Sequence, residues 1–179
     1  AQPEEGNDTA QNEREIRKNI FKNERVNFIL GVILVIFSLY LTISFISFFF
    51  TGSIDQSKVE NLSVGELSSI GNEIQNWTGA FGAYLSNLMI NRWMGISAFI
   101  VSLWLYVVGR RFMKVAHTRM IRFTISCALS IIVLSLFFGF IFMHSYNNTF
   151  LYLGGYHGYY ATLWLNAWIG PWGTALFII

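Results

Sequence analysis

The stretch FILGVILVIFSLYLTISFISFFF, residues 28–50, decides the fold class of this chain. It contains no Asp, Glu, Lys or Arg. At 1.5 Å per residue, a helix of this length reaches roughly 34 Å, and a bilayer core is about 30 Å thick. The run is too long for the apolar region of a signal peptide, and no small-residue cleavage site follows it. We therefore expect a retained transmembrane helix.

Charge elsewhere in the chain is confined to the first two thirds. All 12 basic and 10 acidic residues precede residue 123, so the segment 123–179 carries no formal charge. Charged residues make up 12% of the chain, against about 25% in an average soluble domain. A charge-free stretch of this length does not suit a hydrated surface, whereas it suits contact with lipid. The sequence predicts an all-α, polytopic membrane protein whose main partner is the lipid bilayer.

Four apolar regions alternate with polar segments. After Gly170 and Pro171 only residues 172–179 remain, too few to cross a bilayer, so we expect the last span to be truncated and the natural protein to continue beyond it. Residues 1–27 form a polar and basic N-terminal segment, and residues 28–179 a four-span membrane domain. The expected spans are about 28–50, 79–109, 123–143 and 155–179, with outer loops at 51–76 and 144–154 and a cytoplasmic loop at 109–122.

Basic residues set the expected orientation, because Lys and Arg near the ends of spans favour the cytoplasm. Residues 1–27 hold five of them and the loop at 109–122 holds five more, whereas the two outer loops together hold only Lys58. Two crossings between the basic segments place both on the cytoplasmic side. We expect a cytoplasmic N-terminus, with the topology set by Arg110, Arg111, Lys114, Arg119 and Arg122.

The second and fourth apolar regions resemble each other. Gly79 and Gly82 are spaced like Gly155 and Gly158. A further glycine follows each pair at nearly the same interval, Gly95 in the second region and Gly170 in the fourth. The chain is therefore predicted to be a duplicated helical hairpin, in which each unit consists of a plain span, an outer loop and a glycine-rich segment leading into a second span.

The small residues of these regions have two expected tasks. Hydrophobicity does not drive helices together inside lipid, so close backbone approach has to hold them. Glycine or a Gly-Pro pair can also end or kink a helix. We expect a Gly-rich short or kinked helix before the second and fourth spans, while one long tilted helix stays open. The residues assigned to packing or kinking are Gly79, Gly82, Ala83, Gly95, Gly155, Gly158, Gly170 and Pro171.

A similar small-residue face is expected on the third span. It consists of Ser126, Ser130, Ser135 and Gly139.

Catalytic motifs are missing from the sequence. There is no phosphate loop, no H-E-x-x-H and no G-x-S-x-G. The one cysteine, Cys127, offers neither an intrachain disulfide nor a thiolate cluster. No acid lies within an expected span, which counts against a carboxylate-based ion or proton path. We expect no catalytic, cofactor-binding or metal-ligating residue in this segment, and hence no enzyme.

Two polar features leave alternatives. His144 and His157 flank the short second outer loop, and such a pair could ligate haem axially or border a quinone. We favour ordinary interfacial side chains. Arg92, beside Trp93, is expected to reach the outer interface, because an arginine at the bilayer centre costs at least about 2.5–3.5 kcal/mol.

The glycine-rich segments carry a family resemblance. GAFGAYLSNL (79–88) followed by GISAFI (95–100) is similar to the second-span region of FtsK/SpoIIIE-type DNA translocases, and GGYHGY (154–159) followed by LNAWIGPWGT (165–174) to the fourth. The basic loop after Gly109 fits as well, so the resemblance covers about residues 26–179. It implies the N-terminal four-helix membrane domain of such a translocase, in the bacterial cytoplasmic (inner) membrane.

The resemblance also implies a role. The family moves chromosomal DNA through the closing division septum with a hexameric ATP-driven motor. Its membrane domain anchors that motor and contacts division-site proteins. We thus expect a membrane anchor acting in chromosome segregation and cell division, assembled as a homo-oligomer. ATP, Mg and DNA would engage only the motor, expected beyond Ile179. The alternatives are a structural or accessory subunit of another bacterial membrane complex and, less favoured, a haem- or quinone-binding subunit.

Reporter fusions test the orientation. Fusions at Lys58 and His144 are expected to be external and a fusion at Lys114 internal, because the Lys/Arg bias places both basic segments in the cytoplasm. Paired alkaline phosphatase and fluorescent-protein reporters measure this directly. An external reporter at Lys114 would contradict the predicted topology.

Overall fold

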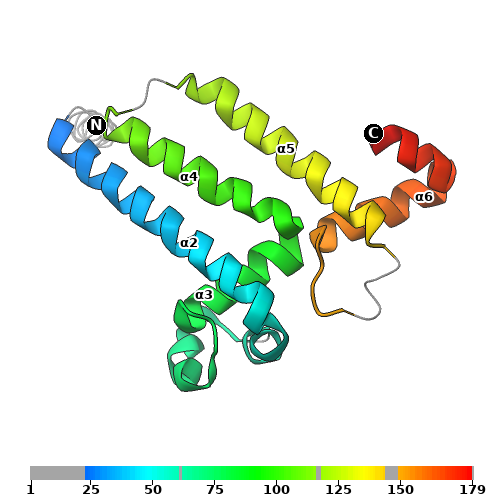
Figure 1. Cartoon of the computed structure of the whole chain (residues 1–179), viewed down its shortest axis with the longest axis horizontal. Coiled ribbons are helices and arrows are strands. Elements are labelled where there is room, and N and C mark those ends of the chain that lie inside the picture. The colour runs from blue at the N-terminus through cyan, green and yellow to red at the C-terminus, as the bar shows by residue number, and fades with distance from the viewer. Residues whose placement is uncertain (1–22, 61, 116–117, 144–148, 179) are drawn as a thin grey trace, which may run out of the picture.

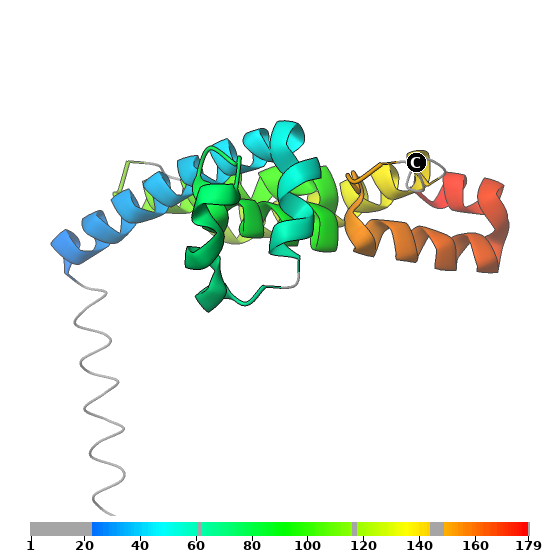
Figure 2. The same cartoon turned by 90° about the horizontal axis from the view of Figure 1, so that it is seen from below.

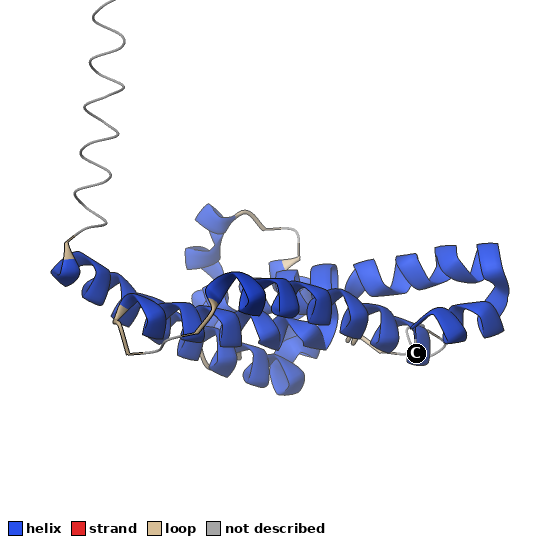
Figure 3. Cartoon of the chain, turned by 90° about the horizontal axis from the view of Figure 1, so that it is seen from above, coloured by secondary structure: helices blue, strands red, loops and turns tan. Residues whose placement is uncertain are grey.

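The computed structural model describes residues 23–60, 62–115, 118–143 and 149–178. Within these ranges every regular element is helical and no strand occurs (Figure 3). The all-α class is therefore confirmed for this part of the chain, whereas the basic segment before residue 23 lies outside it. The elements are α2 (Glu24–Val59), η1 (Val64–Glu73), α3 (Gly79–Ser86), η2 (Asn87–Met94), η3 (Gly95–Ser97), α4 (Ala98–Phe112), α5 (Met120–Ile141) and α6 (Gly155–Ile178).

Among the described residues, three helical stretches are long and apolar enough to cross a membrane. They are Glu24–Val59, Gly79–Phe112 and Met120–Ile141, and an 18-residue window within each has a mean hydropathy of 2.6, 1.4 and 2.4, respectively. Large apolar side chains lie exposed on them, for example Ile121 on α5 and Ile36 on α2. An exposed apolar surface of this kind suits lipid and not water, so the chain is a membrane protein. α6 is not among the three stretches.

The long helices lie side by side. In Figure 1, α4 runs antiparallel to α2 and to α5, and the start of α2, the end of α4 and the start of α5 gather at one end, which we call the basic end. α3 crosses α2 near the opposite end, and α6 packs against α5. Seen after a 90° turn (Figure 2), α6 doubles back close to its C-terminal end.

Helices α2 and α4 approach through two glycines. A Cβ atom built on Gly31 would lie 2.6 Å from the carbonyl oxygen of Gly109, and one built on Gly109 would lie 2.7 Å from that of Gly31. Farther along the pair, the hydroxyl of Ser38 donates to the carbonyl of Ser102 at 2.7 Å. Small residues thus allow backbone contact, and the hydroxyl adds a hydrogen bond where no water competes.

The apolar core lies toward the end of the α2–α4 pair that is opposite to the basic end. It consists of the buried residues Leu41, Phe45, Phe48, Ile90 and Ala98.

Helix α2 is longer than the sequence suggested. The first span was expected to end at residue 50, with a loop over 51–76, but the helix continues to Val59 and η1 occupies much of the remainder. The reason is a buried face that does not stop at residue 50. Thr51, Asp55 and Val59 continue the buried row of Ser44 and Phe48 at helical spacing.

The other span boundaries shift less. The structure places them at Phe112 for the second region, at Met120–Ile141 for the third and at Gly155–Ile178 for the fourth.

The prediction of a small-residue face on the third span is wrong for two of its four residues. Ser135 and Gly139 are buried, whereas Ser126 and Ser130 are exposed. Ser126 lies nine positions, or two and a half turns, before Ser135, so the two point to opposite sides of α5. The buried row runs instead through Cys127, Ser135 and Gly139.

A single methyl group tests the α2–α4 contact. Gly31→Ala is expected to destabilise the domain by about 1–3 kcal/mol, because the backbone of α4 leaves no space for it. Gly71→Ala is the matched control, since a Cβ there meets nothing within 4 Å. Denaturant titration of the protein in mild detergent measures both. Equal stability of the two variants would contradict glycine-mediated packing of α2 and α4.

Candidate functional site

Four glycines among the described residues have a positive φ angle. They are Gly79 (76°), Gly95 (68°), Gly155 (68°) and Gly170 (72°). This left-handed conformation strains any residue with a Cβ atom. The interval from Gly79 to Gly155 matches the interval from Gly95 to Gly170 to within a single position. The unusual backbone positions therefore recur at the same interval as the sequence repeat.

Corresponding glycines also occupy corresponding places in the elements. The backbone N–H of Gly79 donates to the carbonyl of Asn76 at 2.8 Å, and that of Gly155 donates to the carbonyl of Tyr152 at 2.8 Å. Helices α3 and α6 are therefore each preceded by a turn with the same hydrogen bond. Gly95 separates η2 from η3 and α4, and Gly170 interrupts α6. Pro171 follows that break, where its missing N–H costs little.

The predicted packing glycines divide into two groups. Around Gly79 and Gly170, a Cβ atom would meet nothing within 4 Å, so these positions serve only the backbone conformation. At the other positions a Cβ atom would overlap a neighbour. It would meet the hydroxyl of Thr78 at Gly82, the carbonyl of Leu153 at Gly95, the carbonyl of Trp93 at Gly155 and the carbonyl of Ser135 at Gly158.

Ala83 occupies a third kind of position. It is fully buried and forms a small apolar cluster with Val59 and Leu67, which joins the beginning of α3 to the end of α2 and to η1. The hydroxyl of Ser44 on α2 donates to the carbonyl of Gly82 at 2.7 Å. Gly82 of α3 thus packs on α2, whereas Gly158 of α6 packs on α5 and Gly155 packs on η2.

Asn91 joins η2 to the segment that precedes α6, and the sequence did not single it out. This side chain, 1% exposed, lies in η2. Its amide nitrogen donates to the carbonyl of Phe150, and its oxygen accepts from the backbone N–H of Tyr152, both at 3.1 Å. Nearby, the N–H of Ile96 donates to the carbonyl of Leu153 at 2.8 Å. An Asn within an otherwise apolar run was the available signal, because a buried amide requires partners.

The end of α2 carries polar contacts of its own. Asp55, fully buried, accepts a hydrogen bond from the backbone N–H of Gln75 at 2.8 Å. Arg92 is part-exposed; its guanidinium donates to the backbone carbonyl of Glu60 and lies 4.0 Å from that residue's carboxylate. The arginine thus has a local acidic partner rather than a place among apolar side chains.

The segment that follows α2 is fixed by a capping box at the start of η1. The hydroxyl and the backbone N–H of Ser63 both donate to the carboxylate of Glu66, which lowers the pKa of that group.

One of the three histidines lies in the part of the chain that the structure describes. His157 is exposed on α6, and His117 and His144 lie outside the described residues. Among the described residues, no three His, Cys, Asp or Glu side chains gather where they could hold a metal ion.

The predicted topology residues gather at the basic end. Arg110 and Arg111 lie in the last turn of α4, Lys114 follows the helix, Arg119 precedes α5 and Arg122 lies in its first turn. The guanidinium of Arg110 lies over the ring of Tyr106 at 5.7 Å. The sequence predicted that these charges would share one side of the membrane, and the antiparallel packing of α4 and α5 brings them to one end of the bundle (Figure 1).

The sequence of the chain matches the model of a known protein family. The profile of the 4TM region of DNA translocase FtsK/SpoIIIE matches residues 23–179. The chain belongs to this family. Neither the curated proteins nor the solved structures gave a match. The resemblance drawn from the two glycine-rich segments is confirmed, and the FtsK/SpoIIIE 4TM domain is a membrane region separate from the translocase motor. Its match includes every described helix.

A graded series of alanine substitutions tests the two glycine groups of the FtsK/SpoIIIE 4TM domain. Gly79→Ala and Gly170→Ala are expected to cost about 1–2 kcal/mol each, since only the left-handed backbone opposes them. Gly95→Ala and Gly155→Ala are expected to cost more, because the methyl group also overlaps a carbonyl oxygen. Denaturant titration in detergent measures all four.

Gly65→Ala is the control, since Gly65 has open space around it and no positive φ. If Gly95→Ala and Gly155→Ala were no more destabilising than Gly79→Ala, close approach would not be the reason for these glycines.

Proposed function

We propose that this chain is the membrane anchor of an ATP-driven DNA translocase that works at the division septum in chromosome segregation and cell division. The family match over residues 23–179 carries this proposal. The described residues supply apolar helices and a packed helix junction, which is what an anchor requires. ATP and Mg would be bound by the motor, and DNA would be contacted only through it.

The proposed architecture is a four-span duplicated hairpin. α2 with the α3–α4 region forms one unit, and α5 with α6 forms the other. The repeated positive-φ glycines and the matching turns before α3 and α6 support this pairing. A break near the start of each second span would place a short helix at the interface and the main span within the bilayer.

The proposed orientation puts the basic end in the cytoplasm of a bacterial cell, with the domain in the inner membrane. The start of α2, the end of α4 and the start of α5 lie at this end (Figure 1), and five of the basic residues lie along residues 110–122. Lys and Arg beside spans favour the cytoplasmic side. A motor attached beyond the fourth span would then be cytoplasmic, where chromosomal DNA is.

Assembly into a homo-oligomer is part of the proposal. α5 exposes large apolar side chains, including Ile125, Leu129, Ile132 and Val133, along much of its length. Such a surface can contact either lipid or a second copy of the chain. Contacts with division-site membrane proteins would involve the segment of η1 and the turns around it, because this segment projects from the layer of long helices (Figures 2 and 3).

Localisation in dividing cells tests the proposal. The chain carrying a fluorescent protein after Ile179 is expected to concentrate at division septa beyond the level of a passive membrane marker. The marker, an unrelated single-span helix with the same reporter, corrects for the two membranes that lie together at a septum. Fluorescence per unit of membrane area, measured by microscopy, compares the two. A ratio equal to that of the marker would overturn the septal role.

A further inference from the structure

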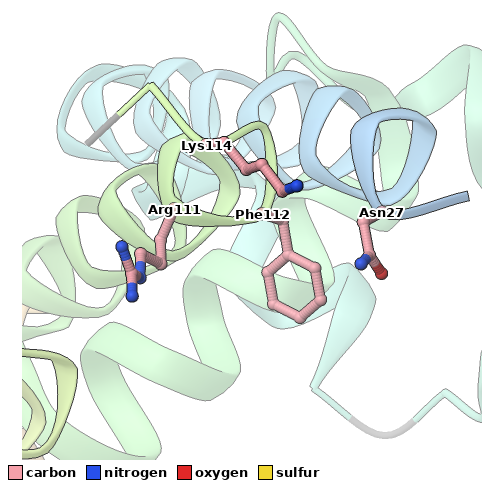
Figure 4. A pocket seen from close by; sticks show the side chains of 4 residues that line it. All are labelled: Asn27, Arg111, Phe112 and Lys114. Atoms are coloured by element: carbon pink, nitrogen blue, oxygen red, sulfur yellow. The ribbon is translucent and has the colours of Figure 1, made fainter. Parts of the chain in front are cut away.

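The basic end contains a hollow between the start of α2 and the end of α4. Its volume is about 630 Å³, and it is lined by Asn27, Arg111, Phe112 and Lys114 (Figure 4). A second hollow of about 500 Å³ adjoins it, shares Phe112 and Lys114, and extends over the first turns of α2. Both volumes fall in the range of small-molecule sites, roughly 300–1,000 Å³.

Lys114 holds a strained backbone conformation at this place. Its φ angle is 60°, and it is the one residue other than glycine with a positive φ in the part of the chain that the structure describes. The N–H of Lys114 donates to the carbonyl of Arg111 and that of Val115 to the carbonyl of Arg110, at 3.0 and 3.1 Å. This pair of bonds is the Schellman ending of a helix, where glycine is the usual residue. Strain of this kind clusters at functional positions.

The side chains at the hollow suit an anion. Lys114 extends toward α2 and Asn27, whereas the side chain of Arg111 points away from both (Figure 4). Arg25 lines the adjoining hollow, and Glu24 is the acid there. Glu24 already pairs with Lys114, but both side chains are largely exposed, at 79% and 65%. An exposed ion pair is weak, so a phosphate group can compete for the ammonium.

The wall of the hollow is apolar on the side of the span. Phe112 lines both hollows, and Phe28 and Ile29 of α2, each more than half exposed, line the second. A soluble anion gains nothing from such a wall. A phospholipid uses both parts, because its phosphate meets the basic groups and its acyl chains lie against the apolar ones. Basic pockets between transmembrane helices bind anionic lipid headgroups in this way.

We propose that the hollow between α2 and α4 binds the phosphate of an anionic phospholipid, held by Lys114 and Arg25, with the acyl chains along Phe28 and Ile29. Lipid binding explains why lysine occupies the positive-φ position, because glycine would end the helix with less backbone strain but would contribute no charge. The site depends on the membrane location of the chain and not on its role at the septum.

Native mass spectrometry of the chain in zwitterionic detergent tests the site, with phosphatidylglycerol and phosphatidylcholine as probes. The wild-type chain is expected to retain phosphatidylglycerol in preference. Lys114→Gly is expected to lower that retention about fivefold, the effect of one basic residue near an anionic surface. Arg25→Gln should act in the same direction. Lys58→Ala, at the opposite end of α2, is the matched control and should bind like the wild type.

Thermal unfolding of the same samples separates binding from folding. Lys114→Gly should unfold at the same or a higher temperature, because glycine suits the positive φ, so weaker lipid binding would not reflect a damaged fold. If this variant unfolds early, retention by Arg25→Gln decides. Equal retention of the two lipids, unchanged retention in both variants, or displacement of the lipid by an equal concentration of inorganic phosphate would each overturn the proposal.

Discussion

Contact between backbones at glycine positions holds this membrane domain together. Gly31 meets Gly109 between α2 and α4, and the backbone of Gly158 lies against Gly139 and Ser135 between α6 and α5. Lipid tails are as apolar as leucine side chains, so burying leucine against leucine gains little inside a bilayer. Short-range dispersion and hydrogen bonding remain, and both need the helix axes to come close. The rest of the structure follows from where small residues permit that approach.

Hydroxyl and amide groups use the space that the small residues provide. The hydroxyls of Ser44 and Ser86 lie 2.7 Å apart between α2 and α3, and that of Ser135 donates to the carbonyl of Gly154 at 2.6 Å between α5 and the turn before α6. Asn91 extends the same principle to the junction between η2 and the segment before α6, where its amide satisfies a carbonyl and an N–H that no helix would satisfy. Polar contacts therefore join α2 to α3 and α5 to the segment before α6, and the buried amide of Asn91 connects these two parts.

The α3–α4 region and α6 are built alike. Each begins with a positive-φ glycine after a turn of the same kind, and each is interrupted at a second such glycine, Gly95 in one and Gly170 in the other. The α3–α4 region is preceded by the last turns of α2 and the η1 segment, and the Arg92–Glu60 pair joins it to the end of α2. At the other end, basic side chains and a strained lysine surround the hollow between α2 and α4, which gives the domain chemically different ends.

The sequence by itself determined the all-α membrane class and the family, because charge-free length and glycine spacing are properties of the chain read in order. It also paired Gly79 with Gly155 and Gly95 with Gly170. Only the tertiary structure decided which of them face a neighbour, because a left-handed turn and a close contact both call for glycine. The extension of α2 through the buried Asp55, the joining role of Asn91 and the exposure of Ser126 depend on contacts with distant segments. Local patterns do not record such contacts.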